Sequence, residues 1–194
     1  MKTFNTVKNA SHSSDQTNEC ASPAKLDQNV FLIGFMGCGK STLASWLEQT
    51  YGLDIIEMDQ LIAEQNGMSI AEIFATKGEE YFRSEETELL KNCASMKNKV
   101  ISCGGGVVMR PVNVEEMKKS GKIVLLTAKP ETILDRTKDD HGRPLLENNK
   151  SVDKIAALME ARRPAYEAAA DFVIETDGKT TAQIGEELFA GFEQ

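Results

Sequence analysis

Short apolar runs alternate along the chain with longer segments in which apolar residues recur every three or four positions. This alternation is typical of parallel strands joined by helices, because each helix returns the chain to the same edge of the sheet. The runs expected as buried strands are residues 30–33, 54–56, 100–102, 123–126 and 172–175. The pattern therefore predicts an α/β fold with three layers, α/β/α, around a central parallel sheet.

Local signals mark where several of the intervening helices begin. Ser69 and Glu72 have the S-x-x-E spacing of a capping box. Pro130 stands where a helix would start, and its missing N–H is harmless there. Ser151 is expected to cap a helix that reaches residue 170. The other helices are expected at residues 39–50, at 79–96 and at the C-terminus, and the polar residues 139–150 are expected to form a mobile loop.

The first 28 residues differ from the rest of the chain in composition. They are rich in Ser, Thr and Asn, and their apolar residues follow no period, so we expect a flexible tail at residues 1–28. Residues 29–194 are expected to form one domain. Lysines and acidic residues balance in the tail, so the net charge of −8 belongs to the domain. An acidic domain argues against nucleic-acid binding, and any phosphate ligand would require locally placed Lys and Arg.

The composition also bears on membranes, metals and location. No apolar run approaches the roughly 18 residues of a membrane-spanning helix. The cysteines, Cys20, Cys38, Cys93 and Cys103, include no C-x-x-C pair, which indicates neither a zinc site nor a disulfide framework. We interpret the chain as a protein of the reduced cytoplasm.

A complete phosphate-binding motif lies between the first predicted strand and the helix after it. Residues 34–41 match G-x-x-x-x-G-K-[ST] in full. The glycines of such a P-loop let its N–H groups converge on phosphate oxygens, aided by the helix N-terminus. Lys40 would place its charge at the β- and γ-phosphates, and Ser41 would ligate Mg²⁺. ATP and Mg²⁺ are therefore the expected cofactors, and the other expected nucleotide contacts in the loop are Gly37, Cys38, Gly39 and Thr42.

Other classes of P-loop protein fit the chain less well. A GTPase reads guanine through N-K-x-D, but after Asn149-Lys150 the Asp comes one place late, at position 153, and no buried strand precedes it. A motor ATPase would require a longer chain. A kinase acting on a small molecule is the better interpretation.

Two carboxylates follow the second predicted strand at the edge where the P-loop is expected. Glu57 and Asp59 are separated by one residue, so at the carboxyl end of a strand both point to the same side. One could hold Mg²⁺ through water while the other orients an acceptor hydroxyl. Asp59 also precedes a helical pattern, so a role as a helix N-cap stays open.

Three consecutive glycines at 104–106 follow the third predicted strand. Glycine is poor strand material and conformationally costly. The run therefore indicates either a tight turn or a close approach between the backbone and a ligand, and we favour the close approach.

Taken together, these motifs resemble those of shikimate kinases. The similar segments, in the order and with the separations of that family, are residues 34–41, Glu57-Met58-Asp59, Phe82-Arg83 with Glu86, glycines 104–106, Arg143-Pro144-Leu145-Leu146 and Arg162-Arg163-Pro164-Ala165-Tyr166. The resemblance covers nearly all of residues 29–180. It implies a P-loop fold like that of nucleoside monophosphate kinases, with a mobile lid. It also implies transfer of the ATP γ-phosphoryl group to the 3-hydroxyl of shikimate, a step in aromatic amino-acid synthesis.

The resemblance assigns the acid-binding residues. The substrate's carboxylate would be held by Arg83, Arg162, Gly104, Gly105 and Gly106. Arginine suits this task because its guanidinium presents a fork of donors to a carboxylate. Asp59 would contact the hydroxyls. For Arg83 a plain surface ion pair with Glu79, one turn earlier, stays open, and Arg163 is expected to face solvent.

The resemblance also assigns the catalytic and nucleotide-side residues. Lys40, Asp59 and Arg143 would be catalytic, with Arg143 in the lid reaching the phosphates when it closes. Arg136 would pack against adenine, although an exposed helix arginine is the alternative. Glu57, through water, would help hold Mg²⁺. The family usually has Asp at that position, so the reach of this carboxylate is altered.

Two other functions stay open at this point. Gluconate kinase shares a P-loop and a paired-acid segment but lacks the triple glycine and the R-P-L-L segment. A nucleotide-binding protein without catalysis is the other, with Glu57 as its one hint in the sequence. The expected partners are ATP and shikimate, without nucleic acid or membrane, and the protein is expected to be a monomer.

Overall fold

A five-stranded parallel sheet forms the centre of the protein in the computed structural model, which describes residues 26–138 and 151–192. In pairing order the strands are β2 (Asp54–Glu57), β3 (Lys99–Ser102), β1 (Asn29–Ile33), β4 (Gly121–Thr127) and β5 (Phe172–Glu175). Every neighbouring pair is parallel. The predicted strands and the predicted parallel sheet are confirmed.

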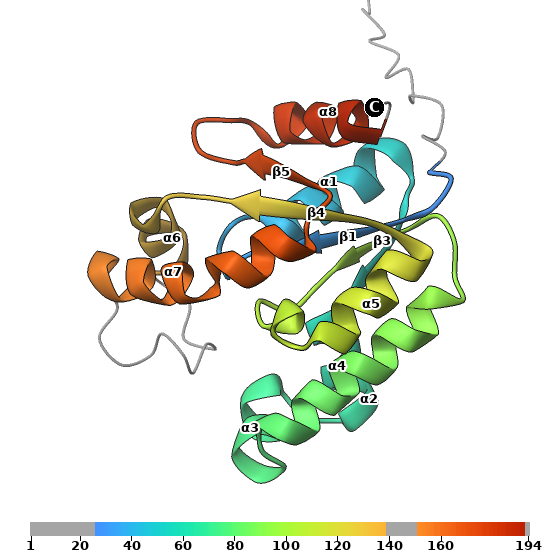
Figure 1. Ribbon diagram of the computed structural model, residues 1–194, viewed down its shortest axis with the longest axis vertical. Helices are drawn as coiled ribbons and strands as arrows, with labels where there is room; N and C mark the ends of the chain where they lie inside the picture. Colours follow the sequence, from blue (N-terminus) through green and yellow to red (C-terminus); the bar gives the residue numbers. More distant parts are fainter. Residues whose placement is uncertain (1–25, 139–150, 193–194) are drawn as a thin grey trace, which may run out of the picture.

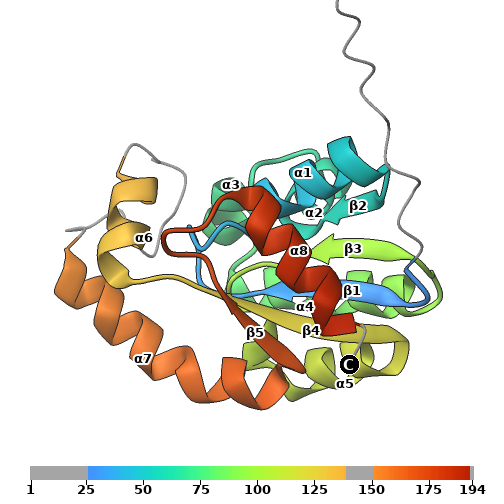
Figure 2. The ribbon, with the colours of Figure 1, turned by 90° about the horizontal axis from the view of Figure 1, so that it is seen from above.

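Helices cover both faces of this sheet and complete the three predicted layers (Figures 1 and 2). The described helices are α1 (Lys40–Tyr51), α2 (Met58–Asn66), α3 (Ile70–Thr76), α4 (Glu79–Ala94), the 3₁₀ turn η1 (Val107–Met109), α5 (Pro111–Ser120), α6 (Pro130–Thr137), α7 (Val152–Ala169) and α8 (Thr181–Phe192).

Alternate residues of β1 point into two separate hydrophobic cores. Val30 and Leu32 join the core that α1, α6 and α8 cover, whereas Phe31 and Ile33 join the core beneath α2, α3, α4 and α5. The sequence of a strand that is buried on both faces is a nearly continuous run of apolar residues. This burial explains why β1 is apolar throughout residues 30–33 rather than alternating.

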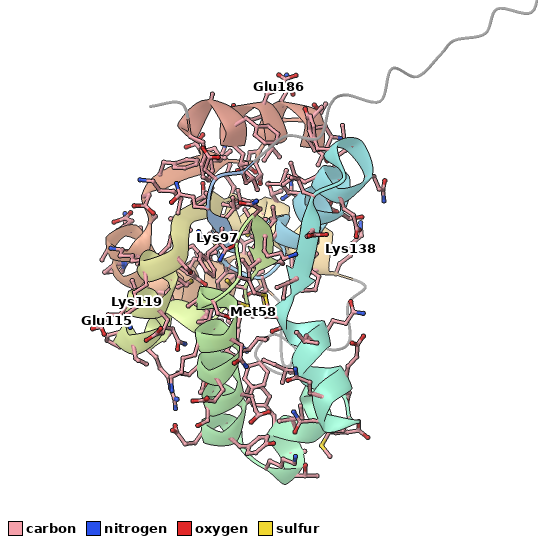
Figure 3. The ribbon with its side chains drawn as sticks, turned by 90° about the vertical axis from the view of Figure 1, so that its right-hand side faces the viewer. Met58, Lys97, Glu115, Lys119, Lys138 and Glu186 are labelled. Carbon is pink, nitrogen blue, oxygen red and sulfur yellow. The ribbon has the colours of Figure 1, made fainter. Side chains whose placement is uncertain are left out.

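The helices turn their polar residues outward. In Figure 3, Glu115 and Lys119 of α5 and Glu186 of α8 lie at the periphery, whereas Met58 at the start of α2 is fully buried.

Across residues 26–138 and 151–192, no helix combines the length and the apolarity that crossing a bilayer requires.

Most predicted helix starts are confirmed together with their local interactions. At α3, the Glu72 carboxylate accepts from the Ser69 N–H at 2.8 Å, and the capping box is complete. Ser151 caps α7, and Pro130 is the first residue of α6. The helical pattern noted after Asp59 corresponds to α2, whereas sequence reasoning missed η1 and α5. Pro111, the first residue of α5, was a usable signal for that helix.

The predicted tail and the predicted mobile loop fall largely outside the described residues. Residues 1–25 and 139–150 are not described, and the division between tail and domain stays a prediction. Leu26, just ahead of β1, is buried in the first core.

Candidate active site

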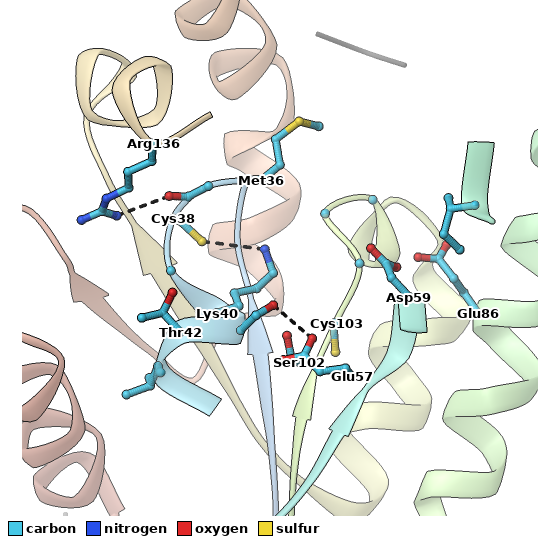
Figure 4. A pocket seen from close by; sticks show the side chains of 18 of the residues that line it. Met36, Cys38, Lys40, Thr42, Glu57, Asp59, Glu86, Ser102, Cys103 and Arg136 are labelled. Carbon is cyan, nitrogen blue, oxygen red and sulfur yellow. Dashed lines mark hydrogen bonds between the residues drawn. The ribbon is translucent and has the colours of Figure 1, made fainter. Parts of the chain in front are cut away.

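A cavity of about 860 Å³ lies at the carboxyl ends of the strands (Figure 4). Its walls come from the P-loop, the junction of β2 and α2, helices α3 and α4, the loop after β3, helices α6 and α7, and the segment between β5 and α8. Ligands of open parallel sheets bind at this edge.

The cavity brings together all the predicted site residues that the structure describes. They are Gly37, Cys38, Gly39, Lys40, Ser41, Thr42, Glu57, Asp59, Arg83, Gly104, Gly105, Gly106, Arg136 and Arg162. Arg143 lies outside the described residues. Residues separated by more than a hundred positions in the chain thus share one site.

The P-loop between β1 and α1 has the backbone that its glycines allow. Gly34, Gly37 and Gly39 have φ angles of 140°, 78° and 105°, which residues with a side chain rarely adopt. Lys40 is almost buried inside the loop, and its ammonium group donates to the carbonyls of Gly34 at 2.9 Å and Phe35 at 3.2 Å. The positive charge is thereby held at the centre of the loop.

Ser41 and Glu57, the two predicted metal-binding residues, are in direct contact beside the P-loop. The Ser41 hydroxyl donates to Glu57 Oε2 at 3.1 Å, and the side chain of Ser102 also hydrogen-bonds to this carboxylate. Burial raises the pKa of Glu57 and Asp59 adds to the rise, whereas both serine hydrogen bonds oppose it. Sequence reasoning missed Ser102, which lies beside Glu57 because the two are paired across β3 and β2.

Asp59 and Glu86 bring two further carboxylates together beside Gly104 (Figure 4). A Cβ atom at position 104 would lie 2.6 Å from Glu86 Oε1 and 2.9 Å from Asp59 Oδ1. A side chain at position 104 would therefore displace one or both of these carboxylates. Glu57 is the N-cap of α2 and Asp59 lies within its first turn, so the alternative role of Asp59 as the N-cap is wrong.

Glu86 is fully buried, and its two carboxylate oxygens differ. Oε2 accepts from Arg83 Nη1 at 2.7 Å, whereas Oε1 has no hydrogen-bond donor in the described part of the chain. Burial raises the pKa of Glu86, although the adjacent Arg83 lowers it in part. A buried oxygen without a donor is available to a ligand hydroxyl or to water.

Arg83 contacts both carboxylates that neighbour it on helix α4. Its Nε and Nη2 donate to the exposed Glu79 at 3.2 and 3.0 Å, and its Nη1 donates to the buried Glu86. The surface ion pair and the support by Glu86 are thus both present, and the guanidinium also lines the cavity. A Cβ atom at Gly106 would lie 2.6 Å from both terminal nitrogens of Arg83. A side chain at position 106 would therefore displace the Arg83 guanidinium.

Arg162 reaches the middle of the glycine loop from α7. Its Nη1 donates to the Gly105 carbonyl at 3.1 Å, and the Tyr166 hydroxyl donates to the same oxygen at 2.5 Å. The guanidinium carbon of Arg162 is 5.8 Å from the ring centroid of Phe35, within the range of a cation–π contact. Arg163 is exposed, as predicted, and is ion-paired on the helix surface.

Arg136 and the segment before α8 form the other end of the cavity. Arg136 Nη1 donates to the Gly37 carbonyl at 3.3 Å and to Thr176 Oγ1 at 3.1 Å. The residue is nevertheless exposed, so it offers a surface beside the P-loop. Sequence reasoning missed the other residues of this end, which are Thr176, Lys179, Thr181 and Ile184.

The chain as a whole is similar to one family of known proteins. The family model described as shikimate kinase matches residues 36–192. A shikimate kinase from Geobacter sulfurreducens is 43% identical over 161 residues, which cover 83% of this chain and 88% of the relative.

Solved structures agree with that match. A shikimate kinase from Acinetobacter baumannii, in complex with shikimate, has a TM-score of 0.80 and 32% identity and covers 86% of this chain and 93% of its own. A gluconokinase from Sinorhizobium meliloti 1021 has a TM-score of 0.56 at 17% identity, over 88% of this chain and 94% of its own; that likeness shows the fold alone. The family model matches residues 36–192, and the shikimate kinase from Geobacter sulfurreducens is 43% identical to this chain over most of both sequences. This chain therefore belongs to the shikimate kinase family.

Proposed function

We propose that the protein transfers the γ-phosphoryl group of ATP to the 3-hydroxyl of shikimate, giving shikimate 3-phosphate and ADP. One observation carries this proposal. A single cavity contains the P-loop with Lys40 and, across from it, Arg83 and Arg162 on either side of the glycine loop. This arrangement fits a triphosphate facing a small carboxylic acid.

The acid end of the cavity matches the chemistry of shikimate, which has one carboxylate and three hydroxyls. Arg83 and Arg162 supply guanidinium forks for the carboxylate. Asp59 and the free oxygen of Glu86, on the same side of the cavity, supply acceptors for hydroxyls. An apolar or cationic acceptor would have no carboxylate to accept hydrogen bonds from the Arg83 and Arg162 guanidinium groups.

The nucleotide end follows from the P-loop and the residues beside it. Main-chain N–H groups of Gly37, Cys38 and Gly39 at the start of α1 would bind phosphate oxygens, with Lys40 between them. Arg136 would then pack against adenine from α6. In this family the phosphoryl donor is ATP.

Mg²⁺ is proposed as the accompanying ion, held by Ser41 and by Glu57 through water. Hydroxyl and carboxylate oxygens are the ligands that Mg²⁺ prefers, and it usually keeps several waters and binds the phosphates of the nucleotide. The 3.1 Å contact between Ser41 and Glu57 supports this proposal, because the longer Glu side chain reaches the P-loop serine. When bound, the ion would neutralise phosphate charge.

The protein's contribution to the reaction would be alignment and charge neutralisation, because phosphoryl transfer proceeds through a loose transition state. Asp59 would orient the attacking hydroxyl. With an ordinary pKa of about 4, a carboxylate is a weak base, so positioning is its expected contribution. Lys40 would stabilise the transferring group. The same role for Arg143, as part of a closing lid, stays a prediction.

The test is ADP release by the purified protein in a coupled assay, with shikimate and with gluconate as acceptors. We expect turnover with shikimate, a background rate with gluconate and with no acceptor, and a product whose phosphate NMR places it on the 3-hydroxyl. Faster turnover with gluconate would contradict the proposal. Tight ATP binding without turnover on either acid would favour a non-catalytic nucleotide-binding protein.

Gly106→Ala should raise the KM for shikimate by roughly tenfold or more, because the added methyl group would displace the Arg83 guanidinium and weaken a charged hydrogen bond. Gly105→Ala is the matched comparison. Its Cβ would meet no atom closer than 3.5 Å, so the KM should rise less. Steady-state kinetics at saturating ATP would check both variants. Equal effects of the two substitutions would show that Arg83 does not depend on the space at position 106.

We further propose a cytoplasmic monomer. The proposal rests on the absence of paired cysteine motifs in the sequence and on the small size of the chain. Light scattering after size-exclusion chromatography would check the oligomeric state.

A further inference from the structure

The Gly105 carbonyl accepts two hydrogen bonds from one helix. Tyr166 and Arg162 of α7 both donate to it, at 2.5 and 3.1 Å. The two residues lie one turn apart, so they reach the loop side by side. The glycine loop is thereby held by two residues of α7 that follow Gly105 by more than fifty positions.

The two donors differ in what else they can do. Arg162 lines the cavity and has five N–H donors and a permanent charge, so it can also bind an anion. Tyr166 is 5% exposed and has a single hydroxyl hydrogen to give. Burial raises the pKa of Tyr166 to about 12. Its hydroxyl therefore remains protonated, and a donor, near neutral pH.

The hydrogen bond from Tyr166 also sets the direction of the peptide that follows. In a trans peptide, the carbonyl of one residue and the N–H of the next point in opposite directions. Holding the Gly105 carbonyl toward α7 turns the Gly106 N–H away from that helix. No backbone carbonyl within residues 26–138 and 151–192 takes this N–H, and Gly106 lines the cavity beside Arg83.

We propose that Tyr166 is a positioning residue for acid recognition, which anchors the Gly105 peptide so that Arg162 and the Gly106 N–H are available to the substrate's carboxylate. This inference rests on the proposed function. Without Tyr166, Arg162 would be the only side chain of the described residues that donates to the Gly105 carbonyl. Turning the guanidinium toward a substrate would then leave that oxygen unsatisfied in a site from which the substrate excludes water.

Tyr166→Phe tests the inference because it removes one oxygen atom and keeps the ring in the core. We expect the KM for shikimate to rise roughly 5- to 30-fold, the range expected when one acceptor loses its donor. The KM for ATP and kcat should change little. The methyl ester of shikimate, which lacks the charge, should show the same KM with both proteins. If Tyr166 had only a structural role, its replacement would raise the KM for shikimate and the KM for the methyl ester together.

Tyr81→Phe is the matched control. The Tyr81 hydroxyl also donates to a protein acceptor, Asn66 Oδ1 at 2.7 Å, but it does not line the cavity. This variant should keep the wild-type KM for shikimate. Melting temperatures of both variants would show whether the fold is retained.

A double-mutant cycle with Arg162→Lys gives a second measurement. Because both side chains act on one carbonyl and one carboxylate, the combined rise in KM should differ from the product of the single effects. Multiplicative effects would overturn the inference, as would an unchanged shikimate KM in Tyr166→Phe. A wild-type protein that does not phosphorylate shikimate would overturn the proposed function and this inference together.

Discussion

Replacement of Asp59 by alanine should lower kcat for shikimate phosphorylation by roughly 10²- to 10⁴-fold, the range seen when a positioned acid–base group is removed, while ATP binding persists. Asp59 lies at the start of α2, beside Gly104 and on the acid side of the cavity. Lys40 and Ser41 belong to the P-loop, on the nucleotide side. The substitution should therefore remove the group that orients the attacking hydroxyl without disturbing the phosphate cradle.

Steady-state kinetics and calorimetric titration with ATP would measure the two effects separately. Asp59→Asn distinguishes the reason for the loss, because the amide keeps an acceptor oxygen but no charge. A rate for Asp59→Asn well above that for Asp59→Ala would indicate positioning, whereas equal losses would indicate that the charge is required. Glu64→Ala, at an exposed acid of the same helix, should behave as wild type. Wild-type turnover in Asp59→Ala would contradict the assigned role.

Arg83→Lys should raise the KM for shikimate by about 10- to 150-fold, equivalent to the 1.5–3 kcal/mol of a hydrogen bond to a charged group. Arg83 uses three nitrogen atoms at once, two toward Glu79 and one toward the buried Glu86. A lysine ammonium is a point charge and cannot serve both partners and a substrate carboxylate. The substitution would also weaken the ion pair that compensates the negative charge of the buried Glu86 carboxylate.

Arg163→Lys is the matched control for this change. Arg163 is exposed and ion-paired with Glu160 on the helix surface, where such pairs contribute little, so its kinetics should equal those of the wild type. The KM for ATP should be unchanged in both variants. A wild-type KM for shikimate in Arg83→Lys would mean that Arg83 serves only its ion pairs.

The charge distribution explains how an acidic protein can bind two anionic ligands. The net charge of the chain is −8. Among the described residues, however, five basic side chains line the cavity, Lys40, Arg83, Arg136, Arg162 and Lys179, together with four acidic ones, Glu57, Asp59, Glu79 and Glu86. Basic groups are thus concentrated where phosphate and carboxylate would bind. The acidic groups among them keep the arginines oriented and provide acceptors for hydroxyls.

The sequence by itself determined the features that depend on local interactions. The P-loop, the five apolar strands, the capping box at Ser69 and the helix start at Pro130 are each specified within about ten consecutive residues. Their physical causes are backbone freedom at glycine, burial of both sheet faces and the satisfaction of helix ends. These causes act over short stretches of chain, and a single sequence displays them directly.

Only the tertiary structure decided which site residues, distant from one another in the sequence, are in contact. The glycine run indicated a close approach, but the groups that approach Gly104 and Gly106 are Asp59, Glu86 and Arg83, which come from other elements. The contact of Tyr166 with Gly105 and the nucleotide-side segment around Thr176 were likewise not visible in the sequence. Such contacts join residues 18 to 61 positions apart. They are created by the packing of the helices on the sheet, and no local periodicity encodes them.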